Sequence, residues 1–345
     1  MSSKNDSERT MATMPGFITH YICGQAALHA APLEAQEMIK PYQQLFNIGT
    51  QGPDIFFYYI PGFLKKNMRH VGIEMHKHHF GAFMQSITDI LLAETLPESS
   101  RAPIFAYICG YLTHYALDAT AHPYVYFKTG TRQKGDKARA IKYSVNHRKF
   151  ETAIDVLMLD LMSSEKPADY KLWQLIKSDS ESAQIAAGAI SEALYEAYDR
   201  NISPREVQKA MMYMVNITRV LQSRTGRRKR LMELMENLTV GEHLVSSIIH
   251  MQNVTDGVDY MNIEKNLWHF PGHDELEKSD SFIEMYHEAV NESTDMITAL
   301  CQYMHDEISR EQLTAIMGDR SLSTGLGADG LMPGTVATSA FSAAH

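Results

Sequence analysis

Cysteine and long apolar runs are both scarce in this sequence, and each absence excludes a class of protein. The three cysteines, Cys23, Cys109 and Cys301, lie far apart and form no CxxC pair. Neither a disulfide framework nor a thiolate zinc site is therefore expected. No run of about 18 apolar residues occurs, so no membrane-spanning helix is expected.

A signal peptide and an excess of positive charge are lacking too. The N-terminal residues MSSKNDSERTMATMPG contain no basic segment followed by an apolar one. Together with the reduced cysteines, this predicts a soluble, cytoplasmic protein. The net charge is −9, with 32 Lys and Arg against 41 Asp and Glu. Nucleic-acid binding relies on cationic side chains, so nucleic acid is not an expected partner.

Strand-like alternation is also absent, whereas helical periodicity extends over most of the chain. Hydrophobic residues make up 44% and charged residues 21% of the sequence, which is a globular composition. From Phe17 onward, apolar residues recur near a 3.6-residue period. We therefore expect an all-α, multi-helix domain over residues 14–317. The polar residues 1–13 and the small, low-complexity residues 318–345 predict a disordered extension and a disordered tail.

Proline and glycine divide the expected domain into helices. The segment NIGTQGPD, residues 47–54, predicts a loop, and Pro123 is expected to end the helix before it. The predicted helices cover approximately residues 17–31, 33–46, 72–94, 102–121, 142–162, 182–199, 204–222, 230–252 and 280–306.

The segment YLTHYALDATAHPY carries the strongest chemical pattern. His114, Asp118 and His122 are spaced at i, i+4 and i+8, so they line one stripe of an α-helix. Neighbouring residues such as Tyr111 and Leu117 are apolar. A polar stripe in such surroundings must find partners or carry a desolvation cost. Metal ions are the natural partners.

A second pair lies in VNHRKFETAID. His147 and Glu151 are one helical turn apart and form a chelating pair. Asp155 continues the same face by another turn and is a candidate acceptor that orients a ligating histidine.

Further candidate ligands occur upstream. His20 lies in GFITHY, Asp54 in GPDIFF and His76 in MHKHH, and His70 is the alternative to His76. All these donors are nitrogen and oxygen atoms without sulfur, which suits catalytic zinc and, as alternatives, manganese or iron. The ligand set favours two or three ions.

The order of these motifs resembles one known family. A histidine, an aspartate, a histidine, then HxxxD with a following histidine and finally HxxxE resemble the zinc-dependent phospholipase C family. Its metal framework is shared with single-strand-specific zinc nucleases. The resemblance covers about residues 15–160. It implies a helical bundle of the bacterial phospholipase C type, with three zinc ions in a cleft.

The resemblance also implies roles for individual residues. Asp54, His76 and His114 resemble the ligands of one ion, and Asp118 resembles the aspartate that bridges this ion to another. A metal-activated water attacks phosphorus in the family. Asp54 is therefore a candidate catalytic base as well as a ligand.

The remaining positions resemble the ligands of two further sites. His122, His147 and Glu151 resemble the ligands of a second ion, and His20 resembles the histidine of a third site. Secreted members complete that third site with an N-terminal tryptophan, which this chain lacks. Pro15 would supply a free amine there if translation began at the preceding methionine.

One spacing departs from the secreted members. Only four residues separate Asp118 from His122, which places His122 on the same helix rather than in a following loop. The sequence therefore resembles an intracellular branch of the family.

Two other groups of residues stay open. The basic run at residues 224–230 is interpreted as a solvated loop, with phosphate or membrane binding as the alternative. A polar and aromatic group either lines the substrate cleft or anchors a buried loop. Its members are Asp259, Asn262, Trp268 and His269.

The leading functional prediction is hydrolysis of a phosphodiester by metal-activated water, with a phospholipid-type molecule as the leading substrate class. The expected partner is thus a small-molecule or lipid phosphate ester. Two alternatives remain at this point: a hydrolase of nucleotide or nucleic-acid phosphate esters, and a non-catalytic helical protein that binds metal or lipid. No HExxH, GxSxG or P-loop motif supports another chemistry.

Overall fold

The computed structural model describes residues 16–59, 68–130, 137–163, 165, 169–221, 230–231, 234 and 253–327. The predicted N-terminal extension, the basic run except its last residue, nearly all of the predicted helix 230–252 and residues 328–345 lie outside these ranges. Helices make up most of the described chain, so the all-α prediction is confirmed. In that part of the chain, no helix is long and apolar enough to cross a membrane.

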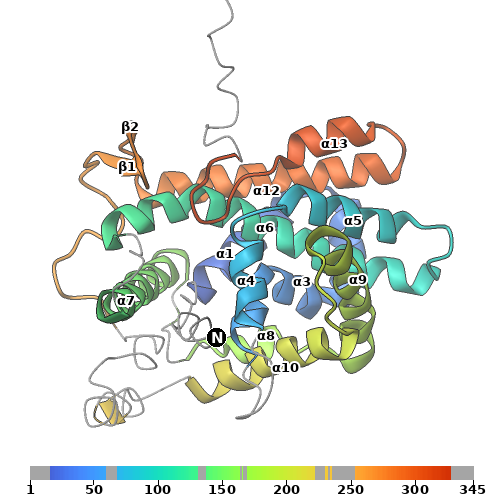
Figure 1. Cartoon of the computed structure of the whole chain (residues 1–345), viewed down its shortest axis with the longest axis horizontal. Coiled ribbons are helices and arrows are strands. Elements are labelled where there is room, and N and C mark those ends of the chain that lie inside the picture. Colours follow the sequence, from blue (N-terminus) through green and yellow to red (C-terminus); the bar gives the residue numbers. More distant parts are fainter. Residues whose placement is uncertain are drawn as a thin grey trace, which may run out of the picture.

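Figure 1 shows how the elements surround one long central helix. The helices are α1 (Phe17–Ala30), α2 (Leu33–Ile39), α3 (Gln43–Gly49), α4 (Arg69–Met75), α5 (Phe80–Leu92), α6 (Glu98–Thr129), α7 (Lys137–Met162), α8 (Leu172–Leu175), α9 (Ser180–Tyr198), α10 (Pro204–Leu221), α12 (Phe282–Met304) and α13 (Arg310–Met317). Two 3₁₀ turns, η1 (Lys40–Tyr42) and η2 (Gly52–Phe57), and two strands, β1 (Trp268–Phe270) and β2 (His273–Lys278), complete the described elements.

Helix α6 is the centre of the fold. It packs against α1, α3, α7, α9 and α12, and its residues are buried without a break from Pro103 to Val125. A helix buried on all sides has no amphipathic pattern, because every face meets another element. The site residues on α6 are therefore held on all sides by neighbouring helices.

The prediction that α6 ends at Pro123 is wrong. Proline removes one backbone N–H, and here the loss falls on the bond to the carbonyl of Ala119. The helix nevertheless continues to Thr129, whose hydroxyl donates to the carbonyl of Val125 at 2.8 Å. Packing around a buried helix outweighs the loss of one hydrogen bond, and the extra turns bring α6 alongside His147 of α7.

The predicted helix over residues 72–94 is two helices. Helix α4 ends at Met75, and α5 begins at Phe80. His79 adopts a left-handed conformation with φ of 64°, which reverses the chain between them. The break places His76 directly after the last residue of α4, where its side chain turns into the core.

The sequence predicted no strands, and this prediction is wrong for residues 268–278. Strands β1 and β2 pair antiparallel as a short hairpin, and Gly272 in its turn has φ of 81°. Trp268 fixes the hairpin to the rest of the chain: its side chain is 1% exposed, and its indole N–H donates to the carbonyl of Asp280 at 3.2 Å. Strands of three and six residues are too short to give a recognisable alternation.

Helices α3 and α6 cross with their backbones in contact. An added Cβ at Gly110 would lie 2.1 Å from the carbonyl oxygen of Phe46, and one at Gly49 would lie 2.4 Å from the carbonyl oxygen of Tyr107. Only glycine permits this approach, which fixes α3, and hence the turn that follows it, against α6.

We expect Gly110→Ala to lower the free energy of unfolding by about 3 kcal/mol, the upper part of the range for overpacked cores. Thermal unfolding followed by circular dichroism measures the loss. Gly188→Ala on α9 is the matched control, because an added Cβ there meets nothing within 4 Å. That change should be neutral or stabilising, since alanine favours helix more than glycine does. Equal stability of the two variants would contradict the close crossing.

Candidate metal centre

All eight predicted ligands converge on one buried region. They come from α1, from η2, from the residue after α4, from three successive turns of α6 and from two turns of α7. None is more than 7% exposed. The eight are His20, Asp54, His76, His114, Asp118, His122, His147 and Glu151.

Asp118 lies at the middle of the region. Its Oδ1 is 3.1 Å from Nε2 of His20. Its Oδ2 is 3.1 Å from Nε2 of His114, 3.4 Å from Nδ1 of His122 and 3.5 Å from Nε2 of His76. One carboxylate therefore faces four imidazoles and uses both of its oxygens to do so.

The donors form three groups, each with atoms within 4.8 Å of one another. The first and second groups share His114, and Asp118 of the first group faces a histidine of each of the other two. The groups are His20, His114 and Asp118; Asp54, His76 and His114; and His122, His147 and Glu151.

The donor geometry fits metal ions better than it fits a network of hydrogen bonds. Several of these buried atoms make no hydrogen bond within the described part of the chain, although partners lie 3.0–3.5 Å away. Zinc–ligand distances of about 2.1 Å in a tetrahedral site separate two ligands by about 3.4 Å. The unsatisfied atoms are Nδ1 of His20, both carboxylate oxygens of Asp54, Nε2 of His114, Oδ2 of Asp118, Nε2 of His147 and Oε2 of Glu151.

A small cavity lies against the same residues. It measures about 30 Å³ and is lined by His20, Asp118, His122 and Glu151 among others. That volume is close to the space that one water molecule occupies in the liquid. The centre therefore has room for an ion or a water between its ligands.

Backbone carbonyls orient two of the imidazoles. Nδ1 of His76 lies 2.6 Å from the carbonyl oxygen of Gly72, and Nδ1 of His114 lies 3.2 Å from that of Thr50. A ring that donates from Nδ1 leaves Nε2 as its lone-pair donor. Such outer hydrogen bonds are typical of metal-ligating histidines, because they fix the tautomer and the ring orientation.

The two histidines of the third group are oriented in the same way. Nδ1 of His147 lies 3.2 Å from the hydroxyl of Thr129 and 3.3 Å from that of Tyr143. Nδ1 of His122 lies 2.8 Å from the carbonyl oxygen of Leu322. Nε2 of both rings then faces Oε1 of Glu151, at 3.1 Å from His122 and 3.0 Å from His147.

Asp155 acts on the backbone that carries His20. Its carboxylate accepts from the N–H of Ile18 at 3.1 Å, and from the N–H and hydroxyl of Thr19 at 2.8 and 2.6 Å. These residues form the first turn of α1, where backbone N–H groups lack helical partners. Asp155, which the sequence predicted to orient a ligating histidine, therefore positions His20 through the first turn of its helix.

The structure separates His76 from its competitors. Nε2 of His76 lies 3.2 Å from Oδ1 of Asp54, inside the second group. His70 is exposed in the first turn of α4, and His78 and His79 are exposed between α4 and α5. The geometry thus favours His76 for the group that contains Asp54.

The loop that carries Asp259 is held together by Asn262. The Asn262 side chain is fully buried, and its amide donates to the carbonyls of Asn266, Ser279 and Asp280 at 3.0–3.2 Å. Trp268 donates to the carbonyl of Asp280 as well. Two members of this group therefore anchor a loop, which favours that alternative over a substrate cleft.

The ligands shift one another's pKa values. Burial raises the pKa of Asp118, but the imidazoles of His122 and His114 outweigh burial and hold it well below its ordinary value. The pKa of Glu151 is lowered against burial by His147 and by the ring of His122. Burial lowers the pKa of His122, whereas Asp118 and Glu151 raise it, to about 10. In the metal-free chain Asp118 and Glu151 are therefore ionised and His122 is protonated at pH 7.

We expect zinc binding at pH 7 to release protons. His122 must lose its proton to become a ligand, and ionised Asp118 and Glu151 contribute none. Apparent zinc affinity should then rise about tenfold per pH unit for each proton released. Calorimetric titration in buffers of different ionisation enthalpy counts the protons. Binding without proton release would show that His122 is not a ligand or is already neutral.

Fold and donor set together define a class of helical proteins with a multi-metal centre of histidines and carboxylates. The family model described as zinc dependent phospholipase C matches residues 19–203, which is more than half of the chain. The chain belongs to the zinc-dependent phospholipase C family, and all eight candidate ligands lie within the matched residues. Its functional class is therefore that of metal-dependent phosphoesterases. No curated protein and no solved structure matches the chain.

The sequence did not predict the residues that hydrogen-bond to the ligands from the C-terminal segment. Leu322 orients His122, and Ser321 and Ser323 both donate to the carbonyl oxygen of His76 at 3.2 Å. These residues lie in the segment that was predicted to be a disordered tail. Their signal is weak, because a backbone carbonyl and a serine in a stretch of small residues have no characteristic spacing.

Proposed function

We propose that this protein is a zinc-dependent phosphodiesterase and that its substrate is a phospholipid-type phosphate diester. The observation that carries the proposal is the shared carboxylate of Asp118. It faces His20 with one oxygen and His76, His114 and His122 with the other. A carboxylate shared in this way would hold neighbouring ions close enough for both to act on one phosphate.

Each group of residues has its own task in this proposal. Asp118 faces histidines of all three donor groups, and its negative charge would offset part of the positive charge of bound ions. His122, His147 and Glu151 form the binding group on the side of α7. Bound zinc would supply a Lewis acid for the phosphoryl oxygens and an activated water as nucleophile.

Asp54 is the candidate base. Both of its oxygens are buried and make no hydrogen bond within the described residues, and one lies 3.2 Å from Nε2 of His76. One oxygen can serve the group of His76 and His114 while the other accepts a proton from the nucleophile. Asp54 would thus combine the roles of ligand and base.

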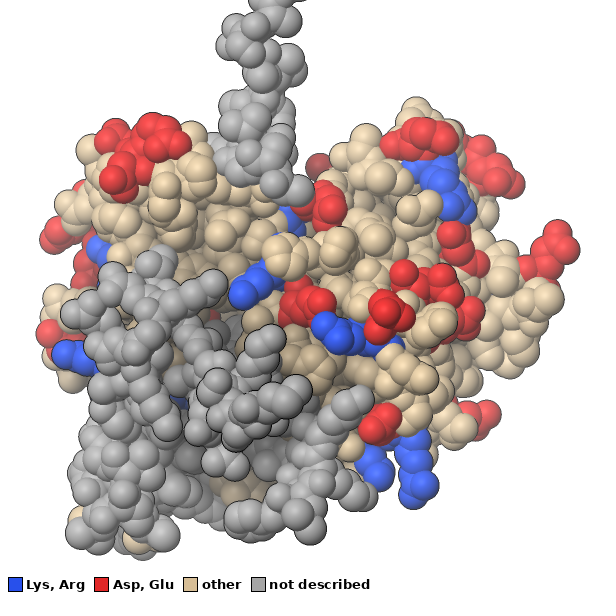
Figure 2. Space-filling model, viewed as in Figure 1, with Lys and Arg blue, Asp and Glu red and all other residues tan. Residues whose placement is uncertain are grey.

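The charge of the chain favours a lipid phosphate over a long nucleic acid. The net charge is −9, and on the face drawn in Figure 2 the described acidic and basic side chains are interspersed. No continuous basic surface follows the described residues on that face, whereas a polynucleotide backbone calls for one. Family membership supports the lipid phosphate as well.

The test combines metal content with hydrolysis. Protein purified without chelator should contain two or three zinc ions per chain by elemental analysis. It should hydrolyse bis-p-nitrophenyl phosphate and phosphatidylcholine vesicles. Hydrolysis should be lost in His114→Ala and Glu151→Ala. It should be retained in His70→Ala, because His70 is exposed and outside all three groups.

The same assay separates the alternatives. Hydrolysis of single-stranded DNA or a nucleotide but not of phosphatidylcholine would replace the lipid by a nucleotide substrate. Bound zinc without hydrolysis of any of these esters would indicate a non-catalytic metal-binding protein. A folded chain that binds no metal would contradict the proposal outright.

A further inference from the structure

The described residues 318–327, here called the C-terminal strap, follow α13 and return across α6 towards α4. Figure 1 shows them as the dark red loop after α13. Leu322 and Leu326 are buried, at 0% and 3% exposed. Residues 318–327, which were predicted to belong to a disordered tail, thus have a defined conformation, with two leucines buried against the rest of the protein.

The strap contacts two ligands that belong to different metal groups. The carbonyl oxygen of Leu322 lies 2.8 Å from Nδ1 of His122. The hydroxyl of Ser321 and the N–H of Ser323 both donate to the carbonyl oxygen of His76 at 3.2 Å. His76 and His122 are 46 residues apart in sequence. Three consecutive residues of the strap, 321–323, contact both of them.

A turn in the strap holds these three residues in shape. The hydroxyl of Ser321 accepts from the N–H groups of Ser323 and Thr324, at 3.2 and 3.3 Å. The carbonyl oxygen of Ser321 accepts from the N–H of Gly325 at 2.8 Å, and its N–H donates to the carbonyl oxygen of Leu326 at 2.9 Å. Ser321 is therefore the residue on which the turn depends.

The strap is also fixed at both ends. At its start, Arg320 forms an ion pair with Glu292 of α12, and its N–H donates to the hydroxyl of Tyr115 at 3.0 Å. Near its end, Gly325 has φ of 69°, and an added Cβ there would lie 2.4 Å from the carbonyl oxygen of Ala119. That carbonyl has no helical N–H partner because residue 123 is proline, so the strap covers α6 where one backbone hydrogen bond is missing.

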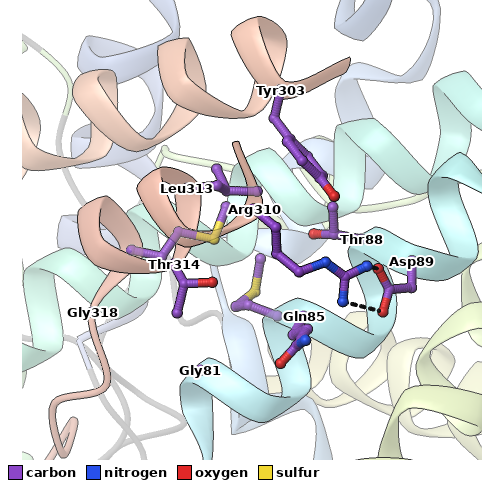
Figure 3. A pocket seen from close by; sticks show the side chains of 11 residues that line it. Gly81, Gln85, Thr88, Asp89, Tyr303, Arg310, Leu313, Thr314 and Gly318 are labelled. Atoms are coloured by element: carbon purple, nitrogen blue, oxygen red, sulfur yellow. Dashed lines mark hydrogen bonds and ion pairs between the residues drawn. The ribbon is translucent and has the colours of Figure 1, made fainter. Parts of the chain in front are cut away.

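Helix α13 anchors the strap to α5. Figure 3 shows Arg310 of α13 paired with Asp89 of α5, with Gly318 at the end of α13 close to Gly81. One residue further on, the carboxylate of Asp319 accepts from the N–H of Gly81 at 3.0 Å. The first residues of the strap thus start from a fixed point on α5.

We propose that the C-terminal strap positions two zinc ligands, with Leu322 fixing the ring of His122 and Ser321 fixing the carbonyl of His76. A carbonyl at Nδ1 selects the tautomer that donates from Nδ1, so Nε2 is left for the ion beside Glu151. The strap thereby couples the His76 group to the His122 group. Ser321 and Leu322 are positioning residues, and their role rests on the zinc binding proposed above.

The test uses the full chain with two variants and Thr324→Ala as matched control. Ser321→Ala removes the hydroxyl that donates to His76. Leu322→Gly keeps the carbonyl that faces His122 but removes the buried side chain that holds this carbonyl in place. Thr324 is in the same turn, but its hydroxyl reaches only the N–H of Leu326 at 3.4 Å. Zinc affinity is measured by competition with a chromogenic chelator. We expect Ser321→Ala and Leu322→Gly to lose about 10- to 100-fold in affinity, the range for outer partners of metal ligands. Thr324→Ala should match the parent protein.

A spectroscopic readout separates positioning from a general loss of stability. In the zinc-loaded parent protein, the Nδ1–H proton of His122 should give a resolved, slowly exchanging resonance. Leu322→Gly should broaden or shift it, and Thr324→Ala should leave it in place. If Leu322→Gly does not fold, the affinity of Ser321→Ala, which removes only the partly buried hydroxyl that donates to His76, decides the question.

Two outcomes overturn different claims. If both variants fold and keep the zinc affinity and the His122 resonance of the parent protein, the strap does not position the ligands. The proposed zinc centre would then be unaffected. A parent protein that binds no zinc would overturn the proposed function itself.

Discussion

Asp118→Asn is expected to abolish hydrolysis, with a loss of at least about 10³-fold in kcat/KM and of most bound zinc. The change keeps the shape of the side chain and removes its charge. Four imidazoles lie within 3.5 Å of the Asp118 oxygens, so an amide N–H₂ would face at least one donor nitrogen or ion. Removing a single group that stabilises developing charge already costs about 10² to 10³-fold in other enzymes.

Steady-state hydrolysis of bis-p-nitrophenyl phosphate and elemental analysis of the same sample measure this effect. Asp295→Asn is the matched control, because it changes the net charge by the same amount at an exposed position on α12. Asp118→Asn that keeps its zinc and its activity would show that the carboxylate does not bridge the metal groups.

Removal of zinc is expected to lower the midpoint of thermal unfolding by more than about 10 °C. Without ions, seven buried oxygens and nitrogens of the centre have no hydrogen-bond partner among the described residues. Each such group costs about 1–3 kcal/mol. Several of them together amount to the order of 10 kcal/mol, comparable to the binding free energy of one structural zinc ion.

Differential scanning calorimetry with and without excess chelator measures the shift, and added zinc should restore the midpoint. The unfolding midpoint should also rise with free zinc concentration, because zinc binds the folded state alone. Asp118→Asn provides the control, since a variant that has lost its zinc should respond little to chelator. Equal midpoints for zinc-loaded and chelated parent protein would contradict the fit of metal to the centre.

Ligands of the centre could be predicted from the sequence where they lie close together on one helix. His114, Asp118 and His122 share one helix, so their common face follows from the helical repeat alone. The same holds for His147 and Glu151 on α7. These five positions needed no tertiary information, and the structure places them as the spacing implies.

The other ligands needed information that spacing does not carry. His20, Asp54 and His76 come from three separate segments, and their order was meaningful only through the family resemblance. The choice of His76 over His70 depends on where α4 ends, and a helix end in a run of polar residues leaves a weak sequence signal.

The helix ends and the C-terminal segment were predicted wrongly for one reason: contacts distant in sequence outweigh local propensity. Pro123 and the break at His79 were judged by local propensity, which packing around α6 and a left-handed residue overrode. The C-terminal strap was missed because its contacts are distant: Leu322 and His122 are 200 residues apart. A segment of small residues that packs by backbone carbonyls has no hydrophobic period to detect.

Anomalous diffraction at the zinc absorption edge would show whether the three donor groups around Asp118 hold zinc. Crystals of protein purified without chelator should give anomalous peaks among the donors of these groups, with one peak beside Glu151 and another beside Asp54. Asp118→Asn crystals should lose at least one of them. Zinc-loaded crystals with no peak among these residues, or with peaks only at exposed histidines such as His78 and His79, would show that these groups are not a zinc centre.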